Sequence, residues 1–372
     1  MSEETSAKIA PPQSEQALLD WLRLIRSRRV GPTTFFRLVG EHGDAQSALA
    51  ELPAIAKAAG VKDYAACTED AALAELRAGR LAGAALVPFG DPRYPALLAE
   101  IPDAPPVFWA LGRVELLTEP MVAIVGARNG SSLGLRMARR LAADLSDAGY
   151  LIVSGMARGI DAAAHEAAPE KRSLAVLAGG VDVVYPRENA VLAQEIQENG
   201  LRLSEMPPGL VPQSRHFIQR NRIVSGLARA TIVVEAAAKS GSLSTARLAA
   251  EQGRDVMAVP GHPFDARASG CNMLIRDGAT LVRSAQDVLA EMAPAEPQAA
   301  PEKQAEMFDD TPSPRRSNLK RDIIALLSQT PVSQDKLIRD LGATAAQTNP
   351  VLLMMEAEGM VVRTSDGRLA KV

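Results

Sequence analysis

The sequence predicts an α/β protein whose main domain is a doubly wound parallel sheet. Five apolar runs of strand length recur along it, at 121–126, 150–154, 173–178, 230–235 and 255–259. Helical patterns, such as those at 132–148 and 243–252, separate most of these runs. Nearly continuous apolar strands that alternate with helices are typical of a parallel sheet covered on both faces. We expect residues 83–291, which begin with a proline-rich lead-in, to form this domain.

Two smaller modules are predicted on either side of the sheet. Residues 15–82 alternate short helical patterns around a Val30-Gly31-Pro32 break, which indicates a small helical domain. Residues 317–372 hold three helical patterns and a strand-like ending with an Asp366-Gly367 turn, which describes a winged-helix-like module. Those helical patterns lie at 319–328, 333–341 and 346–358.

The remaining segments carry no apolar period. Residues 1–14 are polar and contain proline, so we expect a disordered tail. Residues 292–316 are rich in Pro, Ala and Glu, which is typical of a linker.

Composition limits the possible functions. The chain has 372 residues and a net charge of −3, so a nucleic-acid site must be a local patch. Its two cysteines, Cys67 and Cys271, cannot form a disulfide framework, and its four histidines lack metal-ligand spacing. We expect no metal and no cofactor. The chain begins without a secretion signal, and no run approaches the ~18 to 20 apolar residues of a membrane span. A cytoplasmic protein without membrane contact is therefore expected.

The loop after the first apolar run is the first candidate anion site. Its glycines stand at 126, 130 and 134, which is not the Gly-x-Gly-x-x-Gly spacing of dinucleotide enzymes. Backbone N–H groups at a helix start attract phosphate, and Arg128 adds a charged fork. The alternative is a glycine-containing turn with a solvated arginine.

The loop after the second run, from Ser154 and Gly155 to Arg158 and Gly159, again joins small residues to an arginine. Asp161 and His165 follow, one helical turn apart, and could pair as base and orienter. No nucleophile accompanies them, so a helix cap and a satisfied histidine are the alternative. We predict no catalytic residue.

Two further segments carry cations near helix starts. Arg220, Asn221 and Arg222 suit phosphate binding, or else they hold neighbouring loops together. Lys239, followed by small residues at a helix start, makes a second anion site; these residues are Ser240, Gly241 and Ser242. Tyr185, beyond the third run, could stack on a base or pack against its loop.

Seven ordered stretches across 121–280 closely resemble the DNA processing protein A (DprA/Smf) family. They read VAIVGAR, SGMARGIDAAAH, AVLAGGVDVVYP, RNRIVSGL, VVEAAAKSGSLSTA, GRDVMAVPG and GCNMLIRDGA. The resemblance implies an extended Rossmann fold that binds and protects single-stranded DNA. It also implies loading of a RecA-type recombinase during transformation or recombination, and dimerisation through the Rossmann domain.

By position, the family's DNA-contacting loops fall on Arg128, on Ser154 to Gly159 and on Lys239 to Ser242. The sequence departs from the family pattern at Ala127, Leu133 and Gln219, which changes no charge. Leu274, Ile275 and Leu281 are dimer candidates, although burial in the core explains them equally well.

The flanking modules resemble the family's other domains. The N-terminal region is similar to a SAM-like or helix-hairpin-helix module, in which four arginines touch DNA or form a solvated scaffold face. These are Arg23, Arg26, Arg28 and Arg29. The would-be recognition helix of the winged-helix-like module, 346–358, carries no Lys or Arg, which favours a partner contact or a structural role over major-groove reading.

Three rival functions remain to be weighed. A phosphoribohydrolase-like enzyme shares the fold, but its PGG-x-GT-x-x-E signature is absent, since Pro260-Gly261-His262-Pro263 does not match. A dinucleotide-dependent oxidoreductase is disfavoured by the glycine spacing. A pure interaction adaptor would leave the two cationic loops without a purpose.

Overall fold

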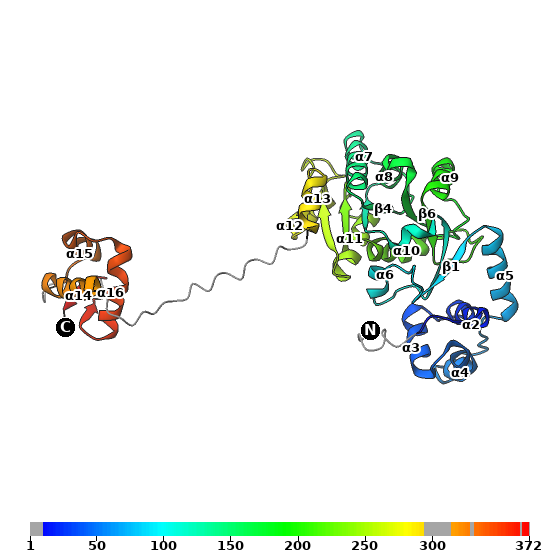
Figure 1. The fold of residues 1–372 in the computed structure, drawn as a ribbon, viewed down its shortest axis with the longest axis horizontal. Coiled ribbons are helices and arrows are strands. Elements are labelled where there is room, and N and C mark those ends of the chain that lie inside the picture. Colours follow the sequence, from blue (N-terminus) through cyan, green and yellow to red (C-terminus); the bar gives the residue numbers. More distant parts are fainter. Residues whose placement is uncertain (1–9, 294–313, 328–330, 365–366, 372) are drawn as a thin grey trace. The chain divides into compact units, whose positions relative to one another are not determined.

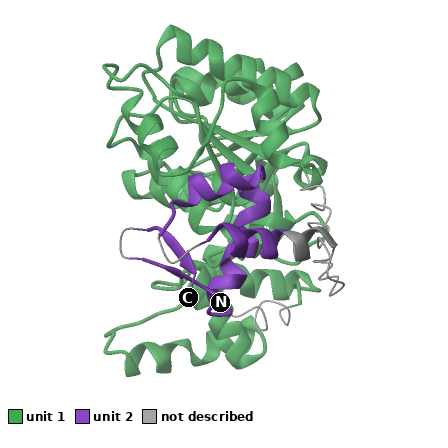
Figure 2. Cartoon of the chain, turned by 90° about the vertical axis from the view of Figure 1, so that its left-hand side faces the viewer, with its two compact units in different colours: residues 1–294 green, residues 295–372 purple. Residues whose placement is uncertain are grey.

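The computed structural model describes residues 10–293, 314–327, 331–364 and 367–371. The chain divides into two compact units, residues 1–294 and 295–372, which Figure 2 colours separately. Most of the expected tail and linker, 1–9 and 294–313, lies outside the described residues, as does Asp366 of the expected turn.

In the described part of the first unit, nine strands form one sheet in the order β1-β2-β6-β5-β4-β3-β7-β8-β9. From β6 to β9 all neighbours are parallel, whereas β2 pairs antiparallel with both β1 and β6. The strands are β1 (Ala85–Pro88), β2 (Val107–Gly112), β3 (Met121–Val125), β4 (Leu151–Ser154), β5 (Ser173–Val176), β6 (Leu201–Ser204), β7 (Ala230–Val233), β8 (Asp255–Ala258) and β9 (Thr280–Leu281).

The doubly wound fold is confirmed, with an antiparallel addition at one edge. The proline-rich lead-in supplies β1 and β2, which extend the parallel sheet beyond β6. The apolar pattern did not predict strand β6, because Arg202 interrupts its run of apolar residues. Burial lowers the pKa of the Arg202 guanidinium, and the side chain donates to Gln197.

Helices cover both faces of the sheet (Figure 1). The helices described in the first unit, including those of the N-terminal helical domain, are α2 (Glu15–Arg26), α3 (Pro32–His42), α4 (Ala45–Ala58), α5 (Glu69–Leu81), α6 (Ala96–Glu100), α7 (Ser132–Asp147), α8 (Ile160–Ala167), α9 (Ala190–Asn199), α10 (Ser214–Leu227), α11 (Gly241–Glu251), α12 (Ser269–Arg276) and α13 (Ala285–Met292). The side chains of β3 alternate between two cores, because successive residues of a strand point to opposite faces. Val122 and Ile124 pack with α7, α8 and α13, whereas Ala123 and Val125 pack with α10 and α11.

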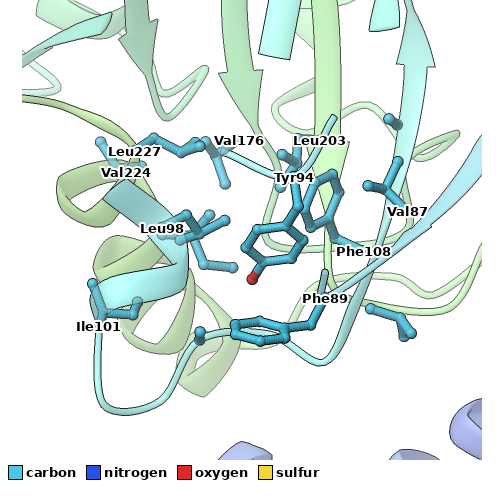
Figure 3. Close-up of a cluster of buried hydrophobic side chains, with 14 of the residues drawn as sticks. Val87, Phe89, Tyr94, Leu98, Ile101, Phe108, Val176, Leu203, Val224 and Leu227 are labelled. Atoms are coloured by element: carbon cyan, nitrogen blue, oxygen red, sulfur yellow. The ribbon is translucent and has the colours of Figure 1, made fainter. Parts of the chain in front are cut away.

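Figure 3 shows part of the second of these cores. Phe89, Tyr94 and Phe108 from the lead-in segment pack there. Phe89 and Tyr94 form an edge-to-face pair with ring centroids 5.3 Å apart, and Tyr94 and Phe108 form a tilted pair at 5.2 Å. The Tyr94 hydroxyl donates to the Pro105 carbonyl at 2.8 Å, which satisfies its polar end. These aromatic contacts join the lead-in segment to the sheet.

The order of the parallel strands reverses at β3. From β3 the chain runs through β4, β5 and β6 on one side, and it then returns to place β7, β8 and β9 on the other. Doubly wound proteins bind ligands in the crevice at such a reversal, outside the carboxyl ends of the strands. The loops after β3, β4 and β7 meet there.

The N-terminal helical domain is tied to the sheet by a buried polar contact. Glu75 on α5 accepts a hydrogen bond from Trp109 Nε1 at 3.0 Å and pairs with Arg26 at 2.9 Å. Arg26 also donates to the Glu205 carbonyl at 2.9 Å. Of the other three candidate arginines, Arg23 pairs with Asp20, Arg28 lies over the Tyr64 ring, and Arg29 is exposed. For Arg26 in particular, the scaffold alternative fits the structure better than contact with DNA.

The second unit is a small helical module with a hairpin, as the sequence predicts. It holds α14 (Pro314–Leu326), α15 (Gln334–Leu341), α16 (Ala345–Ala357) and the antiparallel pair β10 (Val361–Arg363) and β11 (Leu369–Lys371). Helix α14 begins at Pro314, so the linker ends slightly earlier than predicted. Among the helices described in either unit, none has the length and apolar character that crossing a bilayer requires.

We predict that Glu75→Ala lowers the free energy of unfolding by about 3 kcal/mol, because it leaves Arg26 and the Trp109 N–H without their partner. Urea unfolding measures the change. Glu41→Ala is the matched control, since its pair with Arg37 is half exposed and should be worth less than about 1 kcal/mol. Equal losses of unfolding free energy in Glu75→Ala and Glu41→Ala would contradict a stabilising role for the buried contact.

Candidate nucleic-acid interface

An open groove lies where the loops after β3, β4 and β7 meet. It encloses about 760 Å³, and a side lobe of about 400 Å³ adjoins it along Arg128, Ala157, Tyr185 and Phe217. Four of its lining side chains are cationic and one is a carboxylate, Asp161. The cations are Arg128, Arg220, Lys239 and Arg267. The crevice at the reversal of strand order is therefore strongly biased toward anions.

Arg128 and two aromatic rings form one wall of the groove. The Arg128 guanidinium lies 5.5 Å from the centroid of the Phe217 ring, which is cation–π distance. Tyr185 packs against the same ring at 5.4 Å with the planes tilted by 58°, and 47% of its surface stays exposed. Arg128 is thus positioned by contact rather than simply solvated, and Tyr185 is packed and accessible at once.

Two buried side chains of opposite charge, Asp161 and Arg220, lie at the floor of the groove. Asp161 accepts hydrogen bonds from the backbone N–H of Gly155 and Ala157, at 3.2 and 3.3 Å. Burial raises the pKa of the Asp161 carboxyl, while the charge of Arg220 opposes that rise. Burial likewise lowers the pKa of Arg220, against the attraction of Asp161. Each group needs the other to keep its charge in a place with little water.

Two glycines allow the loop after β4 to fit this pair. A Cβ on Gly155 would lie 1.6 Å from Nη1 of Arg220, so only glycine leaves room for the guanidinium. Gly159 has a φ of +75°, and a Cβ there would lie 2.3 Å from the Ala127 carbonyl oxygen. The loops after β3 and β4 are therefore in direct backbone contact.

The third wall comes from the start of α11. The Ser240 hydroxyl accepts from Ser242 N–H at 3.3 Å, and the Ser242 hydroxyl donates to the Gly126 carbonyl at 2.8 Å. Lys239 is exposed and forms no ion pair with any described residue. Arg267 lies beside it on the next loop, pairs with Asp265 at 3.0 Å, and accepts at its carbonyl from Ala236 N–H at 2.7 Å.

The start of α7, the other expected anion site, is already occupied. The Glu235 carboxylate accepts from Ser131 N–H at 2.8 Å, and Ser131 in turn caps the helix by accepting from Gly134 N–H at 3.0 Å. A carboxylate from the end of β7 thus sits where the sequence suggested an open phosphate site.

Two residues predicted to contact DNA, Ser154 and Arg222, are instead buried in contacts within the chain. Ser154 is fully buried and donates its hydroxyl hydrogen to the Ile124 carbonyl at 2.6 Å, because its side chain lies between the strands of a covered sheet. Arg222 points away from the groove and pairs with Glu205 at 2.7 Å and with Asp103 at 2.9 Å. It holds loops together, which was the alternative for this cluster.

The other predicted site residues line the groove or its lobe, except Gly159, which packs against the backbone of Ala127 and Arg128. Arg158 is exposed at the lobe and pairs with Glu188 at 2.5 Å. The half-buried Asn221 and the small residues Ser240, Gly241 and Ser242 line the groove itself. Their contact with DNA stays a prediction.

The sequence alone did not single out Phe217 and Arg267. Phe217 stands inside the basic cluster, two residues after Arg215, and its place between cations was a usable signal. Arg267 follows β8 at the same sheet edge, but a loop of eight residues separates it from the strand.

The suspected pair of Asp161 and His165 does not form. His165 Nδ1 lies 2.8 Å from the Ser173 hydroxyl, while Asp161 binds backbone amides. Burial, followed by the charge of Arg220, lowers the pKa of His165 to about 3. The helix-cap and satisfied-histidine alternative is not met in full either. The N-cap of α8 is Gly159, without a side-chain cap, and Nε2 of the buried His165 has no hydrogen-bond partner among the described residues. Among the described residues no group of three or more His, Cys, Asp or Glu side chains could hold a metal ion.

The dimer candidates differ in accessibility. Leu274 and Ile275 on α12 are partly buried against the core, whereas Leu281 in β9 is 41% exposed. A dimer through these residues stays a prediction.

The fold and the site define a Rossmann-like α/β protein with an open cationic groove at the usual ligand-binding edge. The family described as DNA recombination-mediator protein A matches residues 85–293. A DprA-like N-terminal HHH domain matches 15–78, and a DprA winged helix domain matches 290–367. The chain belongs to this family, the DNA processing protein A or DprA/Smf proteins.

Relatives and solved structures agree with this assignment. The chain is 46% identical over 203 residues to DprA of Streptococcus pneumoniae, covering 54% of this chain and 72% of that protein. The corresponding values for Bacillus subtilis DprA are 43% over 220 residues, 58% and 74%.

Among solved structures, S. pneumoniae DprA is 34% identical with a TM-score of 0.58, covering 77% of this chain and 96% of that one. DprA from Helicobacter pylori, whose structure concerns its single-stranded DNA binding mode, is 31% identical with a TM-score of 0.52, covering 56% and 94%.

We predict that His165 makes the protein sensitive to acid. The unfolded chain takes up this proton near pH 6.5, whereas the folded chain resists it down to about pH 3. Between these values the unfolded state binds more protons, so stability falls as pH falls, by up to about 1.4 kcal/mol per pH unit. Urea unfolding of wild type and His165→Asn from pH 7 to pH 4 measures this. The asparagine keeps a polar group near Ser173 but does not titrate in this range. Parallel curves of unfolding free energy against pH for the two proteins would contradict the prediction.

Proposed function

We propose that this chain binds single-stranded DNA in the groove, protects it, and helps load a RecA-type recombinase in natural transformation or recombination. The observation that carries the proposal is the groove itself, in which Arg128, Lys239 and Arg267 stand beside the Tyr185–Phe217 pair. We further propose that the protein acts as a homodimer in the cytoplasm and performs no catalysis on the DNA.

The cations suit a chain of phosphates better than a single one. Arg128 and Lys239 come from loops after different strands, β3 and β7, and both line one continuous groove. The overall charge of −3 gives no general attraction for DNA, so binding depends on this local cluster. Neutralising several phosphates releases counterions, which makes affinity fall steeply with salt.

The aromatic wall favours single strands. An unpaired base can leave its stack and lie against Phe217 or Tyr185, whereas a base inside a duplex cannot reach them without unpairing. Ring stacking accepts every base, so little sequence preference is expected. That the H. pylori relative has a described single-stranded DNA binding mode supports the same assignment here.

The recombinase and the dimer rest on family membership rather than on this groove. Leu281 is the accessible member of the candidate dimer set. In the second unit, α16 has no Lys or Arg and exposes Leu353, which supports a protein contact for this module rather than groove reading. The rival phosphoribohydrolase activity lacks support, because its signature is not matched by Pro260-Gly261-His262-Pro263.

We predict that Arg128→Ala and Lys239→Ala each weaken oligo-dT binding by about tenfold, which corresponds to about 1.4 kcal/mol. Each should also reduce the slope of log affinity against log salt by about 0.7, the value for one lost phosphate contact on a single strand. A gel-shift series over salt measures both. Arg140→Ala, an exposed arginine on α7, is the control. Equal binding by all variants, or a preference for duplex over oligo-dT, would contradict the proposal that single-stranded DNA binds in this groove.

We predict that Phe217→Ala lowers affinity for oligo-dT by about 1–3 kcal/mol with an unchanged salt slope, because it removes a stacking surface and no charge. Fluorescence anisotropy at two salt concentrations separates the two effects. Phe217→Tyr should retain most of the affinity. A changed slope would instead mean that the ring acts only by positioning Arg128.

A further inference from the structure

The start of α7 holds the chain's own carboxylate. Glu235 reaches Ser131 from 104 residues away in the sequence and accepts its backbone N–H at 2.8 Å. The Ser131 hydroxyl donates to the same carboxylate and accepts from Gly134 N–H. A helix start at the end of a strand beside the reversal point is where Rossmann-like proteins bind a nucleotide phosphate.

Gly134 makes room for this carboxylate. A Cβ at Gly134 would lie 2.4 Å from the carboxyl carbon of Glu235 and 2.6 Å from each of its oxygens. Gly126, at the other end of the same loop, packs against Ile160, where a Cβ would lie 2.6 Å from Cγ1. The glycines of this loop therefore fit internal side chains, which explains why their spacing differs from that of dinucleotide enzymes.

A phosphate and this carboxylate cannot share the helix start. The space that Gly134 leaves is filled by carboxyl atoms, and a second anion would meet like charge at van der Waals distance. The Glu235 carboxylate already receives hydrogen bonds from both the backbone N–H and the hydroxyl of Ser131, so no ligand is needed to satisfy it.

We infer that Glu235 is a specificity-determining residue that takes the place of a nucleotide phosphate at α7 and thereby excludes mononucleotides and dinucleotides from it. Phosphates entering the crevice are left with the start of α11 and with Arg128 and Lys239. The inference concerns α7 alone and holds independently of what the groove binds.

Inorganic phosphate tests the exclusion. Thermal unfolding of the full chain is followed in wild type and Glu235→Ala from 0 to 20 mM phosphate at constant ionic strength. The variant vacates the site, so phosphate should raise its Tm by about 3 °C more than it raises that of wild type. Wild type supplies the baseline for general salt effects and for phosphate in the cationic groove. Glu235→Ser, which also vacates the site, should show the same excess rise.

The decisive control is Glu235→Ala combined with Gly134→Ala, because the new Cβ refills the vacated space and should abolish the excess rise. Adenosine monophosphate in place of phosphate should repeat the pattern. The inference is overturned if neither single variant gains over wild type, if the double variant gains equally, or if both single variants fail to fold even in 20 mM phosphate. No DNA is used, so loss of oligo-dT binding would count against the proposed function and leave this result untouched.

Discussion

The groove depends on one buried pair of opposite charges, Asp161 and Arg220. Burial acts against the charge of both groups, and their mutual attraction with the loop amides of Gly155 and Ala157 compensates for it. The pair fixes the loop after β4 from below. That loop contacts the loop after β3 through Gly159, and Ser242 joins the start of α11 to Gly126. The cations on the rim are therefore held on a rigid frame rather than on independent loops.

The same arrangement shows how a common fold presents an open groove at the reversal of its strand order. A doubly wound sheet provides helix starts at the reversal of strand order, and here the one at α7 is filled by Glu235. The remaining cations come from several strand ends and line an open groove rather than an enclosed pocket. Antiparallel β1 and β2 continue the sheet toward the N-terminal helices, so the frame extends beyond the parallel strands.

The sheet and the cationic edge could be predicted because both follow from local patterns. Apolar runs mark the parallel strands, and small residues with an Arg or Lys mark helix starts. What could not be predicted depends on partners distant in the chain. Arg220 and Arg222 look equivalent in sequence, but residues two apart on a helix point about 200° apart. One faces Asp161, and the other faces Glu205 and Asp103. Glu235 gave no signal either, because its role comes from Ser131 on the neighbouring strand end.

The edges of the sheet have a consequence for solubility. The last strand, β9, contributes two residues, and at the opposite edge β1 ends in Pro88, which has no N–H to donate. Exposed strand edges invite other copies to add to the sheet by backbone pairing, and short or proline-bearing edges discourage it. A two-residue strand offers few backbone groups for pairing, so any contact of another copy with the β9 edge would rest mainly on side chains.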